Sequence, residues 1–275
     1  MKLKKMKLRT EKRYIDAGGR KMKIIILRPK EQQGKLPGIL WMHGGGYMLG
    51  MSEMVYFSCG KMLAEKYGAV VVSPEYTLAG KKPYPAALTD CYDALTYMNS
   101  HRDDLGIDRI IVGGESAGGG LAAALCIYAR DRKEIDISYQ VPLYPMLDCE
   151  DTESSRDNHG KGWNTRWNHW GWRHYLDGLY GSGNVPAYAS PSRETDYAGL
   201  PPCYTFVCEG EPFYVETLIY VKNLQEAGVD AHVDVYKGDI HCFDAMFWTR
   251  QAREARRKLC KEYEAFLSRQ REDPQ

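Results

Sequence analysis

The stretch that decides the fold is RIIVGGESAGGGLAAAL, at residues 109–125. A β-branched run ends in glycines around a single serine, Ser116, and an alanine- and leucine-rich helical pattern begins directly after it. Residues 114–118 match the pattern G-x-S-x-G, in which a sharp turn between a strand and a helix presents a serine hydroxyl above the edge of a sheet. Glycine suits the flanking positions because side chains there would collide in the turn. The alternative is an ordinary glycine-rich turn, but the strand and helix context favours an activated serine.

A second glycine-rich motif, HGGGY at residues 43–47, follows a short apolar strand expected at 37–42. Three consecutive glycines allow backbone N–H groups to approach a ligand closely. Beside the turn at Ser116, the amides of Gly44, Gly45 and Ala117 would form an oxyanion hole. The alternatives are a flexible turn or a phosphate-binding loop, and the latter lacks its G-K-[ST] ending. Together the two motifs predict chemistry at a carbonyl carbon.

Strand and helix patterns alternate along most of the chain, which predicts the α/β class: a mostly parallel sheet with helices on both faces. A hairpin is expected around residues 16–19, and helices are expected at 53–67, 85–98, 116–130, 215–227 and 244–269. Strands are expected at 21–28, 37–42, 69–73, 109–113, 135–143, 203–208 and 231–236. We interpret residues 1–275 as a single domain.

Residues 149–187 break this alternation with a polar and aromatic segment that holds four of the six tryptophans. We interpret it as a small helical cap inserted over the carboxyl edge of the sheet. Its aromatic side chains would line a substrate pocket, although a purely structural helix is the alternative. The pocket residues expected are Tyr47, Trp163, Trp167 and Trp170.

A serine hydroxyl needs a base to remove its proton, and a histidine base needs a carboxylate to orient its ring. Of the seven histidines, only His241 follows the last expected strand in a loop. His43 precedes the serine and is expected to shape the glycine loop. His241 is therefore the predicted base.

The acid should follow the strand expected at 203–208, since α/β-hydrolases run in the order serine, acid, histidine. Glu209, Glu211 and Glu216 compete for this role. Glu211 is favoured because it sits at the turn directly after the strand. Asp239 and Asp244 are weaker candidates.

These motifs resemble the hormone-sensitive-lipase branch of the α/β-hydrolases, particularly its small bacterial acetyl esterases and carboxylesterases. The family's H-G-G-G stands at residues 43–46, its G-D-S-A-G-G as G-E-S-A-G-G at 114–119, and its H-G-F as H-C-F at 241–243. The resemblance implies a serine carboxylesterase for short-acyl esters, with Ser116, Glu211 and His241 as catalytic residues and neither metal nor cofactor.

Three residues depart from the family pattern: Glu211 and Glu115 replace aspartates, and Cys242 replaces a glycine beside the base. Glutamate serves as the triad acid elsewhere in this fold. About thirty-five residues precede the glycine-loop strand, which leaves no room for the family's N-terminal cap helices. We therefore expect a reduced cap and an open site. An amidase or peptidase on the same fold, or a catalytically silent binding protein, are the alternative functions.

Composition limits the partners. A net charge of +1 gives no signature of nucleic-acid or membrane binding, and the basic cluster within residues 2–13 is interpreted as a solvated edge. The chain shows neither a signal peptide nor a transmembrane segment, and its eight scattered cysteines lack metal-binding spacing. We expect free thiols, a cytoplasmic location and a small-molecule ester as partner. A homodimer remains an open alternative.

Overall fold

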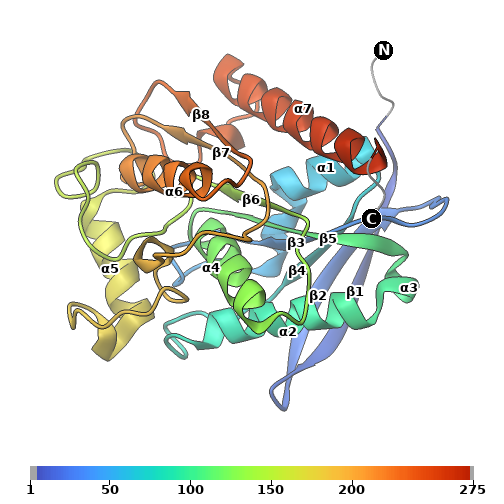
Figure 1. Ribbon diagram of the computed structural model, residues 1–275, viewed down its shortest axis with the longest axis horizontal. Coiled ribbons are helices and arrows are strands. Elements are labelled where there is room, and N and C mark those ends of the chain that lie inside the picture. The colour runs from blue at the N-terminus through green and yellow to red at the C-terminus, as the bar shows by residue number, and fades with distance from the viewer. Residues whose placement is uncertain (1–4, 273–275) are drawn as a thin grey trace.

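The computed structural model describes residues 5–272. The first part of the basic N-terminal cluster, residues 2–4, lies outside this range. The strands are β1 (Leu8–Ala17), β2 (Arg20–Pro29), β3 (Leu36–Met42), β4 (Val70–Pro74), β5 (Ile107–Glu115), β6 (Tyr139–Leu143), β7 (Cys203–Cys208) and β8 (Ala231–Tyr236). They form one eight-stranded sheet in the order β1-β2-β4-β3-β5-β6-β7-β8 (Figure 1). Strands β3 to β8 pair in parallel, while β2 pairs antiparallel with both β1 and β4.

The connections between strands carry the helices. The α-helices are α1 (Cys59–Tyr67), α2 (Ala86–Ser100), α3 (Arg102–Leu105), α4 (Ala117–Arg132), α5 (Thr165–Leu176), α6 (Tyr214–Glu226) and α7 (Arg250–Glu272). Short 3-10 helices are η1 (Ser52–Phe57), η2 (Asp177–Leu179), η3 (Pro191–Arg193) and η4 (Phe243–Ala245). The predicted α/β-hydrolase class, with a mostly parallel sheet, is confirmed.

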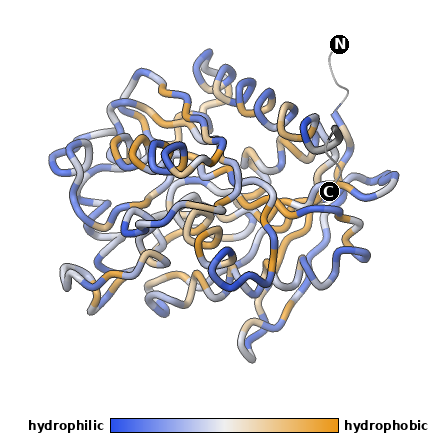
Figure 2. Tube along the Cα trace, viewed as in Figure 1, coloured by the Kyte–Doolittle hydropathy of each residue, from blue (hydrophilic) through white to orange (hydrophobic). Residues whose placement is uncertain are grey.

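Helices cover both faces of the sheet. Figure 1 shows α1 and α7 together on one side and α2 and α4 on the opposite side. Successive side chains of a strand point to opposite faces, so Ile24 and Ile26 of β2 join one apolar core while Ile25 and Leu27 join the other. The central strands therefore bury apolar residues on both faces, and Figure 2 shows hydrophobic residues along them. This two-sided burial holds the carboxyl ends of the parallel strands, where the functional motifs lie, in fixed positions.

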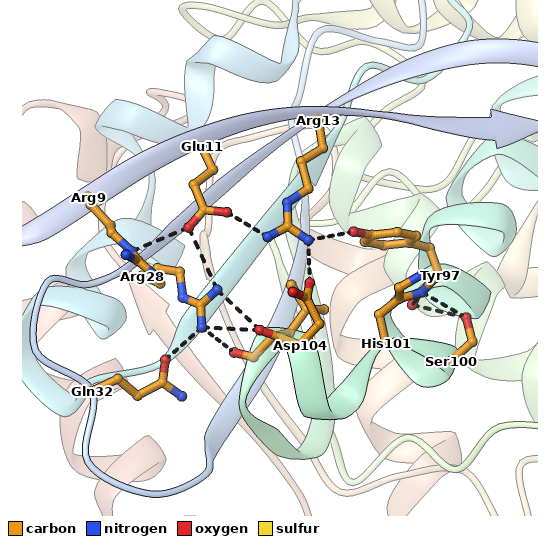
Figure 3. Close-up of polar contacts among 10 residues, drawn as sticks. Arg9, Glu11, Arg13, Arg28, Gln32, Tyr97, Ser100, His101 and Asp104 are labelled. Atoms are coloured by element: carbon orange, nitrogen blue, oxygen red, sulfur yellow. Dashed lines mark hydrogen bonds and ion pairs between the residues drawn. The ribbon is translucent and has the colours of Figure 1, made fainter.

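The predicted N-terminal hairpin is confirmed, with β1 and β2 paired along their whole lengths. Polar contacts fasten it to the helical layer (Figure 3). The nearly buried guanidinium of Arg28 donates to the Leu105 carbonyl and to Gln32, each at 3.1 Å. Arg13 donates to the Tyr97 hydroxyl at 2.9 Å. These contacts secure the only edge of the sheet that is antiparallel.

Three predicted elements have different boundaries. The closing helix expected from residue 244 begins instead at Arg250, because residues 243–245 form η4 and the carboxylate of Asp244 turns inward to accept from the Tyr144 hydroxyl at 2.7 Å. The strand expected at 135–143 is confined to Tyr139–Leu143. The helix expected at 53–67 is divided at Ser58, whose hydroxyl accepts from the Lys61 N–H and so caps α1.

The segment between β6 and β7 contains one α-helix, α5, which lies far from the β1–β2 hairpin (Figure 1). The side chain of Asn164 caps its N-terminus by accepting from the Trp167 N–H. The buried face of α5 packs on the glycine loop, since Tyr175 stacks on Tyr47 with a centroid distance of 3.9 Å. Across the described residues, no helix combines the length and apolarity needed to span a membrane.

The turn after β5 depends on a close approach that only glycine permits. A Cβ at Gly118 would lie 2.3 Å from the Met42 carbonyl oxygen and 2.4 Å from that of His43. Neither backbone oxygen can move freely, so we predict that Gly118→Ala lowers the free energy of unfolding by about 1–3 kcal/mol. Urea denaturation followed by tryptophan fluorescence measures this loss. Gly178→Ala is the matched control, because a Cβ there meets no atom within 4 Å; equal midpoints for the two variants would contradict the packing argument.

Candidate active site

Ser116 occupies the turn between β5 and α4 with φ 57° and ψ −120°. A non-glycine residue rarely adopts a positive φ, and such strain persists only where the surroundings enforce it. Here the Ser116 N–H donates to the Leu143 carbonyl at 3.0 Å, and its carbonyl accepts from the Met146 N–H at 3.1 Å. Both partners belong to the end of β6 or the loop after it. The neighbouring strand therefore fixes the turn that presents the Ser116 hydroxyl.

The glycine loop after β3 lies directly beside this turn. A Cβ at Gly44 would lie 3.0 Å from the Glu115 carbonyl oxygen and 3.2 Å from the Ser116 Cβ, so a larger residue there would crowd the serine turn. Gly44 and Gly45 line the same cavity as Ser116. Ala117 is the first residue of α4, so the helix offers its N–H no acceptor. The structure thus brings the three predicted oxyanion-hole residues around one serine.

The side chains of His43 and Tyr76 support the glycine loop. Their rings stack with centroids 4.2 Å apart, and the Tyr76 hydroxyl donates to the His43 carbonyl at 2.8 Å. Both side chains are buried. Burial lowers the pKa of His43, which keeps its imidazole neutral. His43 therefore shapes the loop, as predicted from its position ahead of the serine.

His241 reaches Ser116 from the loop after β8. Its Nε2 lies 2.9 Å from the Ser116 Oγ, and its Nδ1 makes a short contact with Oε2 of Glu211. The second oxygen of Glu211 accepts from the Cys208 N–H at 2.8 Å, which holds the carboxylate at the end of β7. Glu211 is completely buried and His241 nearly so. A carboxylate, an imidazole and a hydroxyl from three distant segments thus form one hydrogen-bonded row.

The two other glutamates considered for the acid lie elsewhere. Glu209 is exposed to solvent. Glu216 is buried, and its Oε1 accepts from the N–H groups of Leu147 at 2.7 Å and Asp148 at 3.3 Å. Burial raises the pKa of Glu216 well above its ordinary value. Glu216 therefore ties α6 to the loop after β6, and Glu211 is the carboxylate beside the histidine.

Opposing effects act on the protonation of His241. Burial alone lowers its pKa, but electrostatic and hydrogen-bond interactions with Cys242 and with the carboxylate of Glu211 raise it. The net result is a raised pKa. The rings of Tyr144 and Phe213 pack edge-on against the imidazole, each with a centroid distance of 5.1 Å. These contacts restrict the ring to the orientation that the hydrogen bonds require.

Ser116 and His241 open into a cavity of about 340 Å³, which we name the reaction cavity. Trp163 forms part of its wall, as expected for a pocket residue. The other lining residues are Gly44, Gly45, Met54, Phe57, Ser58, Glu115, Tyr144, Gly162, Cys242, Asp244, Ala245 and Arg256.

The other three aromatic residues expected in the pocket do not line this cavity. Tyr47 is buried, and its hydroxyl donates a hydrogen bond to the Met146 carbonyl at 3.1 Å. This bond connects the glycine loop to the loop after β6. Trp167 is 46% exposed and packs edge-on against Trp170. Helical spacing groups Trp167 and Trp170 on α5 but does not reveal which aromatic rings face the serine. Of the predicted pocket residues, only Trp163 is placed beside it.

Sequence reasoning missed a charged cluster in the wall of the reaction cavity. Asp244 accepts from the Tyr144 hydroxyl and lies 3.6 Å from Arg256. Glu115 accepts from the Trp41 Nε1–H at 2.7 Å, and burial together with the charge of Asp244 raises the pKa of Glu115 to about 8. No local motif marks Asp244 or Arg256. Within the described range, no three or more His, Cys, Asp or Glu side chains are grouped to hold a metal ion.

Comparisons with known proteins agree with this fold. A family model described as the alpha/beta hydrolase fold matches residues 39–245. Esterase LipI of Mycobacterium tuberculosis is 32% identical over 73% of this chain, which spans 63% of LipI's length. Ethyl acetate hydrolase of Pseudomonas putida is 27% identical, with 83% of this chain and 73% of the relative covered. A solved bacterial heroin esterase superposes with a TM-score of 0.87 at 32% identity, covering 95% of this chain and 84% of its own.

Proposed function

This chain belongs to the α/β-hydrolase family, in its hormone-sensitive-lipase branch, and we propose that it is a serine carboxylesterase. The observation that carries the proposal is the hydrogen-bonded row of Glu211, His241 and Ser116, with 2.9 Å between the imidazole Nε2 and the serine Oγ. A serine becomes nucleophilic when a base at this distance accepts its proton. The glycine loop beside the serine supports acyl transfer in particular, because it supplies N–H donors where an oxyanion would form.

In the first half-reaction, the Ser116 Oγ attacks the ester carbonyl carbon while His241 Nε2 accepts the hydroxyl proton. The carbonyl oxygen becomes an oxyanion, which accepts hydrogen bonds from the amides of Gly44, Gly45 and Ala117. Each such donor contributes on the order of 3 kcal/mol to transition-state stabilisation. When the tetrahedral intermediate collapses, the bond to the alcohol oxygen breaks and His241 donates its proton to that leaving group. The acyl group remains on Ser116.

In the second half-reaction, water attacks the acyl carbon and His241 accepts its proton. A second oxyanion forms in the same site and collapses, releasing the carboxylic acid as the proton returns to the Ser116 Oγ. Glu211 keeps the Nδ1–H of the ring pointed toward itself, which leaves Nε2 free as the base, and it stabilises the imidazolium that forms in each half-reaction. The longer side chain of glutamate is accommodated because the Cys208 N–H anchors its other oxygen.

A short acyl group, acetyl to butyryl, is the proposed preference. The reaction cavity of about 340 Å³ supports it, because this volume lies near the lower end of the range for small-molecule sites. The similarity to an ethyl acetate hydrolase supports the same preference. The hydrogen-bonded row of serine, base and acid disfavours the silent-binding alternative. The similarity to named esterases favours ester hydrolysis over the amidase or peptidase alternative.

Removing members of the row should abolish turnover. We predict that Ser116→Ala eliminates hydrolysis of p-nitrophenyl acetate and that Glu211→Gln lowers kcat by about 10³- to 10⁴-fold, because the amide no longer selects the reactive ring tautomer. Glu209→Gln and Glu216→Gln are the matched controls and should keep near-native rates. Steady-state kinetics on folded variants, checked by circular dichroism, measures these effects. A wild-type protein without turnover would instead favour a silent binding protein.

The acyl preference predicts a decline in kcat/KM with chain length. Across p-nitrophenyl acetate, butyrate, octanoate and palmitate, we expect the maximum at acetate or butyrate. Octanoate should be at least about tenfold slower, because a longer chain outgrows the cavity and leaves apolar carbons in water. A maximum at octanoate or beyond would exclude the short-acyl preference while leaving the esterase proposal intact.

The raised pKa of His241 predicts an alkaline profile. The base must be neutral to act, so kcat/KM should fall about tenfold per pH unit below that pKa and level off only above it. Cys242→Gly removes one of the interactions that raise the pKa of His241 and should move the rise toward the ordinary histidine value of about 6.5. Cys149→Ser, at a half-buried thiol outside the reaction cavity, is the control. Identical profiles for wild type and Cys242→Gly would contradict the electrostatic role assigned to Cys242.

A further inference from the structure

The reaction cavity has a neighbour that the proposed hydrolysis does not use. This second cavity, which we name the side groove, measures about 630 Å³. It shares Phe57, Ser58, Ala245 and Arg256 with the wall of the reaction cavity. Its remaining lining residues are Lys5, Tyr56, Lys61, Met62, Glu65, Lys66 and Phe247. A ligand whose ester lies at Ser116 can therefore extend along a shared wall into the side groove.

Positive charge dominates the side groove. Lys5 and Lys61 both pair with the same carboxylate, Glu65, so their combined charge is only half balanced. Lys66 reaches across to the Cys260 sulfur at 3.1 Å. Arg256 adds a fourth cation, at the boundary with the reaction cavity, where the carboxylate of Asp244 lies 3.6 Å from it. Four cations against these two carboxylates leave a net positive charge, which favours an anionic ligand.

Arg256 is well placed to connect the two cavities. Its Nε donates to the Asp244 carbonyl at 3.0 Å, and one terminal nitrogen donates to the Phe57 carbonyl at 3.2 Å. Its side chain is 18% exposed, which is low for a surface arginine and limits its freedom. A guanidinium held in this way loses little conformational entropy when it binds a carboxylate or phosphate.

Apolar rings flank these charges. Phe57 is 82% exposed and Phe247 is 64% exposed, and the Phe247 ring packs edge-on against the equally exposed Trp248. Neither phenylalanine contributes to a core in this exposed position. Phe57 lies on the boundary of both cavities, so an apolar segment of a ligand that passes from one cavity to the other would cover it.

We propose that the side groove binds the anionic end of the ester substrate. That substrate carries its ester at one end, an apolar linker that crosses Phe57, and a carboxylate or phosphate that meets Lys61, Lys66 and Arg256. The inference rests on the proposed esterase function and names the substrate class of that site. The side groove also provides specificity, since a neutral ester of equal length gains no electrostatic binding energy from its cations.

Paired esters test the proposal. On the acyl side, p-nitrophenyl monoesters of glutaric, adipic and suberic acids are compared with neutral p-nitrophenyl esters of equal chain length. On the alcohol side, acetates of carboxyphenol and of hydroxyphenyl phosphate are compared with phenyl acetate. The readout is the ratio of kcat/KM for the anionic ester to that for its neutral partner. We expect a ratio above one on at least one side, falling toward one in 0.5 M salt, where the screening length is only a few ångströms.

A matched pair of lysines separates the groove from general surface charge. Lys61 pairs with Glu65 in α1, and Lys222 pairs with Glu226 at the same i,i+4 spacing in α6, away from both cavities. Lys61→Gln should lower the ratio by about threefold, the effect of one partly exposed charge, and adding Lys66→Gln should lower it further. Lys222→Gln should leave it unchanged.

The outcomes distinguish the two proposals. If no ester is hydrolysed, the esterase function itself fails. If neutral esters are hydrolysed while every ratio stays at or below one, the function stands and the side groove is not an anion subsite. Equal ratios for Lys61→Gln and Lys222→Gln would overturn the proposal in the same way. A ratio above one that is confined to the phosphate esters or to the carboxylate esters would identify the anion that the side groove binds.

Discussion

The close contact between the start of α4 and the end of β3 is the constraint on which the rest of this molecule depends. At Gly118 the helix backbone approaches the Met42 and His43 carbonyls so closely that no side chain fits between them. This contact sets the serine turn beside the glycine loop, and the loop after β6 then secures the turn through backbone hydrogen bonds with Ser116. Rigid packing of the central sheet therefore positions the hydroxyl and the oxyanion donors together.

Charge is balanced differently in the two walls of the site. Around His241, the buried carboxylate of Glu211 favours the charged imidazole. Elsewhere in the cavity wall, burial and Asp244 raise the pKa of Glu115 to about 8, so Glu115 is largely neutral at pH 7 while Asp244 is paired with Arg256. The site therefore holds the negative charge of Glu211 beside the catalytic base and limits negative charge beside the developing oxyanion.

Motif spacing predicted much of this arrangement, because tight turns and close approaches restrict the residue types that fit. The turn at Ser116, the glycine loop and the loop of His241 all carry such restrictions. Glu211 was distinguishable from Glu209 and Glu216 by its position at the end of β7, although only the fold shows which carboxylate meets the ring. The positions of most strands and the hairpin followed from hydrophobic patterning, whereas the order of the strands in the sheet was not predicted.

Features formed by tertiary contacts were not predictable. The periodicity of α5 groups Trp167 and Trp170 but does not reveal that neither lines the reaction cavity. The closing helix begins late because Asp244 is held by groups from the loop after β6, from α1 and from α7, which no local pattern contains. In the sequence, Arg256 is one of many charged residues on a long amphipathic helix. Its role at the cavity boundary depends entirely on residues that the fold brings next to it.

The position of β8 has a further consequence. This strand pairs with β7 at one margin of the sheet, and the loop after it carries His241. Marginal strands separate at a lower free-energy cost than buried central ones. Partial fraying of β8 would move the His241 imidazole away while Ser116 and the glycine loop stay in place. Catalysis should therefore be lost on heating before the whole molecule unfolds.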